Sequence, residues 1–195
     1  MRPILIAAAL GLVATTAAAE PETYTLDPSH SQVLFSYNHL GYSTTWGMFS
    51  GFEGKISFDT ETPEASSVEV SMPVTSMLTG WEDRFKHFMS PDFFDASDAE
   101  MVTFASTGIE VTGENTALIT GDLTLNGVTK EIVLDAKLNQ AGMHPMANTP
   151  WAGFDATTQL IRSDYNLGKF APFVSDEVEL KISVEAQKAA DGNAG

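Results

Sequence analysis

Apolar and polar residues alternate along most of the chain from residue 29 onward. A period of two is typical of strands that bury one face, whereas a helix repeats every 3.6 residues. Phe49 is out of phase with the run that follows it, so a bulge or bend is expected near Ser50 and Gly51. The alternating runs predict about eight strands, at residues 33–39, 52–58, 68–74, 102–106, 119–125, 128–138, 154–160 and 178–186.

One segment has a helical rather than a strand period. Its apolar residues are Trp81, Phe85, Phe88 and Met89. Thr79 precedes Glu82 by three residues, which is the pattern of a capping box at a helix start. We predict a helix over about 80–89, followed by a turn or short helical piece at 91–95, because Pro91 suits a first helical position.

Strands with a single apolar face must bury that face against one another. A closed antiparallel barrel achieves this and removes the exposed sheet edges that would aggregate; a sandwich is the alternative. The barrel is favoured because the inward faces carry many phenylalanines and few charges. Asn126 and Gly127 form the strongest two-residue hairpin signal, between two of the runs. We therefore predict a mainly β, single antiparallel barrel of about eight strands, with a short helical segment near residues 80–95.

The N-terminus has the pattern of a secretory signal peptide. Arg2 precedes an apolar stretch at residues 4–13, and small residues follow up to Ala19, after which we expect cleavage. An uncleaved membrane anchor is the alternative, although the stretch is about half of a spanning helix. The expected organisation is a signal peptide at 1–19, one domain at 20–188 and a frayed tail at 189–195, in a protein of the bacterial periplasm.

Composition narrows the classes of function. The chain has 195 residues and a formal net charge of -16, which argues against binding nucleic acid or anionic lipid surfaces. It has 0 cysteines, so disulfides, thiolate nucleophiles and cysteine-ligated metals are excluded. With 43% hydrophobic residues the chain is apolar enough to fold into a globular domain held together by packing.

Motifs of catalysis and metal binding are missing from the sequence. There is no nucleophile elbow, no dinucleotide or phosphate-binding loop and no H-E-x-x-H. His30 and His39 are nine residues apart, so on one strand they would face opposite sides and could not share an ion. An acidic run could hold Ca²⁺ but does not match EF-hand spacing, and a solvated loop is the favoured interpretation; it comprises Asp92, Asp95, Asp98 and Glu100. We predict no catalytic residues and no metal.

Two polar residues share faces with apolar residues that point into the predicted barrel. His39 shares the face of Val33, Phe35 and Tyr37, and is either a hydrogen-bonded interior histidine or a contact for a ligand headgroup. Arg162 follows the strand that carries Phe154, and either meets an anionic headgroup at the barrel mouth or forms a salt bridge. The phenylalanines either fill the barrel or line a cavity.

Ordered motifs over about residues 22–188 resemble the YceI-like domain family. These motifs are Tyr24-x-Leu26-Asp27-x-x-His30-Ser31, Phe35-x-x-x-His39-x-Gly41, Gly47-x-Phe49, Gly54-x-Ile56-x-Phe58-Asp59, His87-Phe88-x-Ser90-x-Asp92-Phe93-Phe94-Asp95, Thr103-Phe104-x-Ser106, Gly121-x-Leu123-Thr124-Leu125-x-Gly127-Val128-Thr129-Lys130, Arg162-Ser163-Asp164-Tyr165, and Ser175-Asp176-Glu177-Val178 to Glu185-Ala186. The resemblance implies an exported, lipocalin-like barrel with a helical side piece, no established catalytic residues and, in some members, a polyisoprenoid inside the barrel. The family usually has Phe-Gly after Arg-Ser-Asp, whereas Tyr165 to Gly168 follow here, at the expected barrel rim.

The leading hypothesis is a periplasmic protein that carries or sequesters a long-chain isoprenoid, of polyprenyl or quinone type. It needs no cofactor besides the bound lipid, no nucleic acid and no stable membrane insertion; a homodimer and a membrane redox partner are left open. The alternatives are a filled interaction or stress module and a lipid-acting enzyme that uses His39 and an inward acid. The expected ligand-binding residues are Val33, Phe35, Tyr37, His39, Phe49, Phe52, Phe104, Phe154, Leu160 and Arg162.

Overall fold

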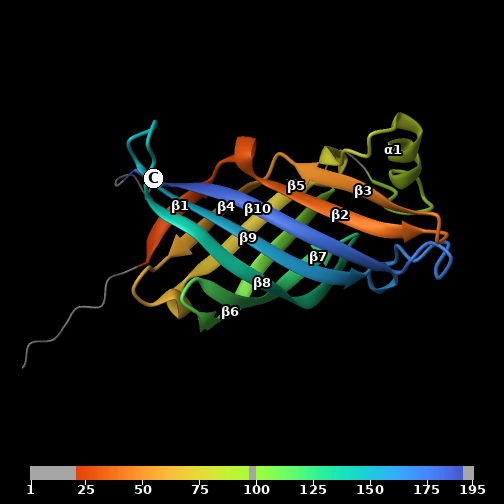
Figure 1. Ribbon diagram of the computed structural model, residues 1–195. Helices are drawn as coiled ribbons and strands as arrows, with labels where there is room; N and C mark the ends of the chain where they lie inside the picture. The colour runs from red at the N-terminus through yellow and green to blue at the C-terminus, as the bar shows by residue number, and fades with distance from the viewer. Residues whose placement is uncertain (1–20, 97–99, 191–195) are drawn as a thin grey trace, which may run out of the picture.

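The computed structural model describes residues 21–96 and 100–190 (Figure 1). The predicted signal peptide at 1–19 lies outside the described residues, as do Asp98 and the last five residues of the predicted tail. Within the described part, no helix is long and apolar enough to span a membrane.

The described chain is built mainly of β-strands in one antiparallel sheet. A single α-helix, α1 (Glu82–Phe88), is described, together with the 3-10 helices η1 (Pro28–His30), η2 (Pro63–Ala65), η3 (Val74–Ser76) and η4 (Arg162–Tyr165). The strands are β1 (Glu22–Leu26), β2 (Gln32–His39), β3 (Ser43–Ser50), β4 (Glu53–Phe58), β5 (Ser67–Pro73), β6 (Met101–Gly113), β7 (Thr116–Leu125), β8 (Val128–Met143), β9 (Pro150–Ile161) and β10 (Glu177–Lys188).

The sheet closes on itself because β1 pairs with both β4 and β10. The closed circuit runs β1-β4-β5-β6-β7-β8-β9-β10 and returns to β1, which makes it eight-stranded. β2 continues from β1 along the other half of β10, and β3 pairs with β2. The predicted antiparallel barrel is therefore confirmed and the sandwich is excluded, because closure leaves the circuit without an edge.

Two strands, β1 and β3, were not among the predicted alternating runs. In β3 the inward positions include Gly47, which pairs with Phe35 of β2. A Cβ at Gly47 would lie 2.1 Å from Cζ of Phe35, so the aromatic ring occupies the space that an apolar side chain of β3 would otherwise fill. The sequence of β3 therefore shows no alternation of apolar and polar residues at this position, because Phe35 of β2 supplies the apolar group.

Both predicted breaks in strand geometry are confirmed. β3 ends at Ser50 and β4 begins at Glu53, with Gly51 at φ +72 between them. Asn126 and Gly127 connect β7 to β8 with φ values of 50 and 71, as a type I′ hairpin turn requires. These positive φ values explain why asparagine and glycine occupy the turn.

Helix α1 lies within the predicted range, but the predicted capping box is wrong. The residue before the helix is Trp81, whose side chain makes no capping hydrogen bond. The hydroxyl of Thr79 instead donates to the carbonyl of Trp81 at 2.7 Å. Thr79 lies two residues before the helix cap, so its hydroxyl forms a local turn and does not reach the free amides of the first helical turn.

Candidate functional site

The barrel encloses a cavity of about 1150 Å³. Inward-facing side chains of β2 to β10 line it, and most of them are apolar. The phenylalanines of the barrel therefore line a cavity and do not fill it. Some also pack on one another, as Phe58 and Phe154 do edge to face with ring centroids 5.4 Å apart.

Every residue predicted to bind a ligand lines this cavity. For the residues within strands, such as Val33, Phe104 and Leu160, strand parity accounts for this result, because side chains on a strand alternate between its two faces. The structure thus brings together Val33, Phe35, Tyr37, His39, Phe49, Phe52, Phe104, Phe154, Leu160 and Arg162. Whether they contact a ligand stays a prediction.

Lining residues outside the alternating runs were missed by the sequence analysis. Trp81 and Phe88 come from the region of α1, and Phe170 and Phe173 come from the segment between η4 and β10. Helix α1, the β2–β3 turn and this segment lie at the same end of the barrel, which we call the α1 end (Figure 1). The helical spacing predicted the helix that carries the α1 residues, but not that it lines the cavity. No sequence pattern indicates that the segment between η4 and β10 lies over the cavity.

Arg162 holds the segment 163–176 in place at the α1 end. Its side chain is buried, and its guanidinium donates to the carbonyls of Ser175, Lys169 and Val174, each at 2.8 Å, and to that of Leu167. Four of the five N–H donors of the guanidinium are thereby engaged. Burial lowers the pKa of Arg162.

The predicted salt bridge of Arg162 does not form within the described chain, because backbone carbonyls occupy the directions in which a carboxylate would bind. Contact between its remaining N–H and a ligand stays a prediction.

His39 lies at the rim of the cavity, and the interior, hydrogen-bonded interpretation is wrong. Its side chain is exposed, and its backbone pairs with Val174. Across residues 21–96 and 100–190 no side chain hydrogen-bonds its ring, and no inward acid pairs with it. β2 ends at His39, so the alternation that pointed the side chain inward carries it out to the opening.

Tyr37, two residues before His39, is the deeper polar group. Burial raises the pKa of its hydroxyl, and the positive charge of Arg84 opposes that shift. Its ring packs against Phe88 of α1 with centroids 6.3 Å apart. Tyr37 therefore offers a half-buried hydroxyl to the cavity, near Arg84 and Arg162, where a ligand headgroup could be oriented.

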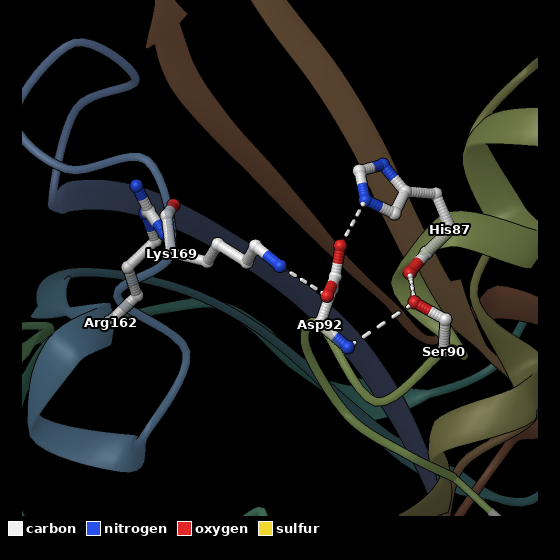
Figure 2. Close-up of polar contacts among 5 residues, drawn as sticks. All are labelled: His87, Ser90, Asp92, Arg162 and Lys169. Atoms are coloured by element: carbon white, nitrogen blue, oxygen red, sulfur yellow. Dashed lines mark hydrogen bonds and ion pairs between the residues drawn. The ribbon is translucent and has the colours of Figure 1, made fainter.

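A polar network connects the α1 region to segment 163–176 (Figure 2). Lys169 forms an ion pair with one carboxylate oxygen of Asp92, and Nε2 of His87 lies 3.2 Å from the other. The Ser90 hydroxyl donates to the carbonyl of His87 at 2.7 Å and accepts from the amide of Asp92. Hydrogen bonds from Lys169 and His87 lower the pKa of Asp92. Of the predicted acidic run, Asp92 is thus an ion-paired residue rather than a free one.

A cluster outside the cavity contains potential metal ligands. Asp27, His30 and Glu185 each have one ligand atom within 4.8 Å of the others. Nδ1 of His30 lies 2.6 Å from Asp27, which raises the pKa of His30, and the indole of Trp151 donates to Glu185 at 2.9 Å. The amide of Asp27 also donates to the carbonyl of Glu185 at 2.8 Å, so these residues join the start of η1 to β10.

The chain is similar over most of its length to proteins of one family. The sequence profile of the YceI-like domain matches residues 24–186. The chain belongs to the YceI-like domain family. A UPF0312 protein of Ectopseudomonas mendocina is 42% identical over 187 residues, covering 95% of this chain and 97% of the relative. A UPF0312 protein of Azotobacter vinelandii is 39% identical over 188 residues, with the same coverage.

Solved structures show the same barrel. BcnA of Burkholderia cenocepacia matches with a TM-score of 0.74 and 26% identity, over 82% of this chain and 98% of BcnA. The YceI protein of Campylobacter jejuni matches with a TM-score of 0.71 and 29% identity, over 78% and 90% of the two chains. A domain of Saccharophagus degradans described as polyisoprenoid binding matches with a TM-score of 0.65 and 14% identity, over 85% and 98%, and this likeness shows the fold alone.

The departure from the usual YceI motif forms a packed turn at the rim. Tyr165 is buried, and Asn126 donates to its carbonyl at 2.9 Å. Asn166 follows at φ 60, and a Cβ at Gly168 would lie 2.7 Å from the Cβ of Ser163. The altered residues therefore close tightly onto η4, and they leave Arg162 on the cavity wall.

Proposed function

We propose that this YceI-family protein carries or sequesters a long-chain isoprenoid lipid, of polyprenyl or quinone type, in the bacterial periplasm. The observation that carries the proposal is the apolar cavity, which extends from Arg162 and Phe173 at the α1 end to Thr60 and Glu114 at the opposite end. Its volume of about 1150 Å³ exceeds the roughly 300–1,000 Å³ of ordinary small-molecule pockets. A long, narrow and apolar guest suits this shape better than a compact polar one.

The energetics of such a ligand need no charged partner. Each CH₂ group removed from water contributes about 0.8 kcal/mol, so a polyprenyl chain enclosed along the barrel is retained by burial alone. Polar side chains line both ends of the cavity; those at the α1 end, such as Tyr37, would orient a headgroup rather than supply most of the affinity. No chemical step on the lipid is required, and we propose a binding protein rather than an enzyme.

Two further observations support the lipid and its compartment. The domain of Saccharophagus degradans is described as polyisoprenoid binding, and the same barrel here has an interior apolar enough for such a ligand. The apolar N-terminal stretch with small residues up to Ala19, in a chain with 0 cysteines, favours export to the periplasm.

The test is mass spectrometry of protein purified from the periplasm of its own source, under native conditions and after organic extraction. We expect a stoichiometric prenyl species that is lost on extraction. Phe154→Asp places a charge in the cavity wall and should reduce the bound lipid by more than tenfold, because burying an unpaired carboxylate against the chain is unfavourable.

Thr157→Asp is the matched control, since it adds the same charge on an exposed position of β9 and should leave the lipid bound. Thermal unfolding of both variants separates ligand loss from misfolding. An apo mass for the unmodified protein, or equal retention in Phe154→Asp, would contradict the proposal.

A further inference from the structure

Large exposed apolar side chains gather around the opening of the cavity at the α1 end. Tyr42 is 91% exposed in the β2–β3 turn, Trp81 is 59% exposed before α1, and Phe173 is 76% exposed in segment 163–176. Leu40 and Phe170 are about half exposed beside them. We call Leu40, Tyr42, Trp81, Phe170 and Phe173 the mouth patch.

The mouth patch is continuous with the interior of the barrel. Leu40, Trp81, Phe170 and Phe173 are exposed to solvent and also line the cavity. The amide of Leu40 donates to the carbonyl of Phe173 at 3.1 Å, which joins the β2–β3 turn to segment 163–176. An apolar path therefore leads from the barrel interior onto the outer surface, beside polar side chains of the same end such as His39 and Arg84.

The backbone presents two of these side chains at a conformational cost. Leu40 has φ 58 and Phe170 has φ 67, in the left-handed region that suits glycine or asparagine rather than bulky residues. Leu40 and Gly41 are the central residues of a type I′ turn, closed by the amide of Tyr42 on the carbonyl of His39 at 3.0 Å. A large apolar side chain at such a position is unfavourable for folding and points to a role outside the fold.

Electrostatic attraction is not what would bind a partner to the mouth patch. Lys169 is paired with Asp92, and Lys86 of α1 is paired with Glu82 at 2.6 Å. The whole chain has a net charge of -16, so an anionic surface would repel it. Tryptophan, tyrosine and phenylalanine are the side chains that enter the headgroup region of a bilayer through apolar contact.

We propose that the mouth patch docks the α1 end onto the surface of a zwitterionic lipid bilayer, so that an isoprenoid chain passes between bilayer and barrel without crossing water. This inference rests on the proposed function, since it assigns the route by which the same cavity exchanges its ligand. The bilayer fits the patch because the cavity, the patch and the hydrocarbon region would form one continuous apolar phase.

Flotation of the purified protein with phosphatidylcholine vesicles tests the docking. The double variant Tyr42→Ser, Phe173→Ser should weaken partitioning by roughly tenfold or more, given the area that each aromatic ring would bury. Met146→Ser is the matched control, because Met146 is 87% exposed at the β8–β9 turn, at the opposite end of the barrel (Figure 1). Raising the salt concentration should leave partitioning unchanged, since apolar contact is not screened.

Leu40→Asn separates docking from folding. Asparagine suits the positive φ, so this variant should unfold at the same or a higher temperature than the unmodified protein while binding vesicles more weakly. If Leu40→Asn bound vesicles more weakly only because it unfolded at a lower temperature, the proposal would be overturned.

Three results would refute the docking: no partitioning of the unmodified protein, equal losses in Met146→Ser, or binding that salt abolishes. Sedimentation velocity tests whether a second copy of the chain covers the mouth patch instead of a bilayer. A dimer that dissociates in the double variant, together with no vesicle binding by the unmodified protein, would assign the patch to that second copy. Mass spectrometry after extraction distinguishes the two proposals. Bound lipid without vesicle affinity contradicts only the docking, and vesicle affinity without bound lipid contradicts only the carrier function.

Discussion

The β4–β5 connection and segment 163–176 lie at opposite ends of the barrel and are held in place in different ways. At the end opposite α1, the connection from β4 to β5 is closed locally: the buried carboxylate of Asp59 accepts from the amides of Glu61 and Thr62, each at 2.8 Å. At the α1 end the contacts join distant parts of the chain. The amide of Asn38 donates to the hydroxyl of Ser175, 137 residues away, and Lys169 pairs with Asp92, 77 residues away.

The β4–β5 connection can therefore form with its own turn, whereas segment 163–176 is held in place only when the barrel has closed. Local hydrogen bonds order few residues, whereas the long-range ones at the α1 end depend on β2, α1 and segment 163–176 meeting. Regions that depend on such contacts open more readily than the strands that support them. In the proposed function, segment 163–176 is therefore the part of the cavity wall expected to open for a ligand.

Arg162→Ala should have the largest effect, because it removes the group that joins segment 163–176 to the barrel. Four carbonyls lose their donor, and we expect a loss of at least about 3 kcal/mol in the free energy of unfolding, measured in urea. Arg84→Ala is the control, since Arg84 donates to a single carbonyl, that of Thr79, at 2.9 Å. Equal losses in the two variants would show that the α1 end does not depend on Arg162.

Asp59→Ala should have an intermediate effect that is confined to the opposite end. Removing a buried acceptor that serves two amides is expected to cost about 1–2 kcal/mol. Hydrogen exchange should speed up at residues 60–66 and stay unchanged at 163–176. Combined with Arg162→Ala, its cost should be additive within about 0.5 kcal/mol, because distant sites act independently. Strong non-additivity would mean that the two ends are coupled.

Asp92→Asn should have the smallest effect on stability, since the ion pair with Lys169 is exposed. The pKa of Asp92 is lowered in the folded protein, so its contribution is present above the unfolded value of about 3.9 and is lost as the pH falls through the folded value. Hydrogen exchange of segment 163–176 should therefore be faster in the variant at pH 7 and equal in both proteins in strong acid. A difference that persists in acid would exclude the ion pair as its cause.

Strand parity made much of the site predictable. Phe35, Phe104 and Phe154 could be placed on the cavity wall because a period of two fixes which face a residue joins. Parity could not show that His39 lies at the rim, since that depends on where β2 ends and which segment pairs with it. Nor could it show that Gly47 continues the apolar wall, since Phe35 of the neighbouring strand supplies the ring.

The sequence by itself determined that this chain forms strands with one apolar and one polar face, and which side chains of those strands lie on the apolar face. These properties follow from local periodicity, which a single strand already contains. Only the tertiary structure decided that the barrel is hollow, that Arg162 bonds to carbonyls rather than to a carboxylate, and that Tyr42, Trp81 and Phe173 surround one opening. Those outcomes depend on how residues far apart in the chain meet, and no local pattern records such distances.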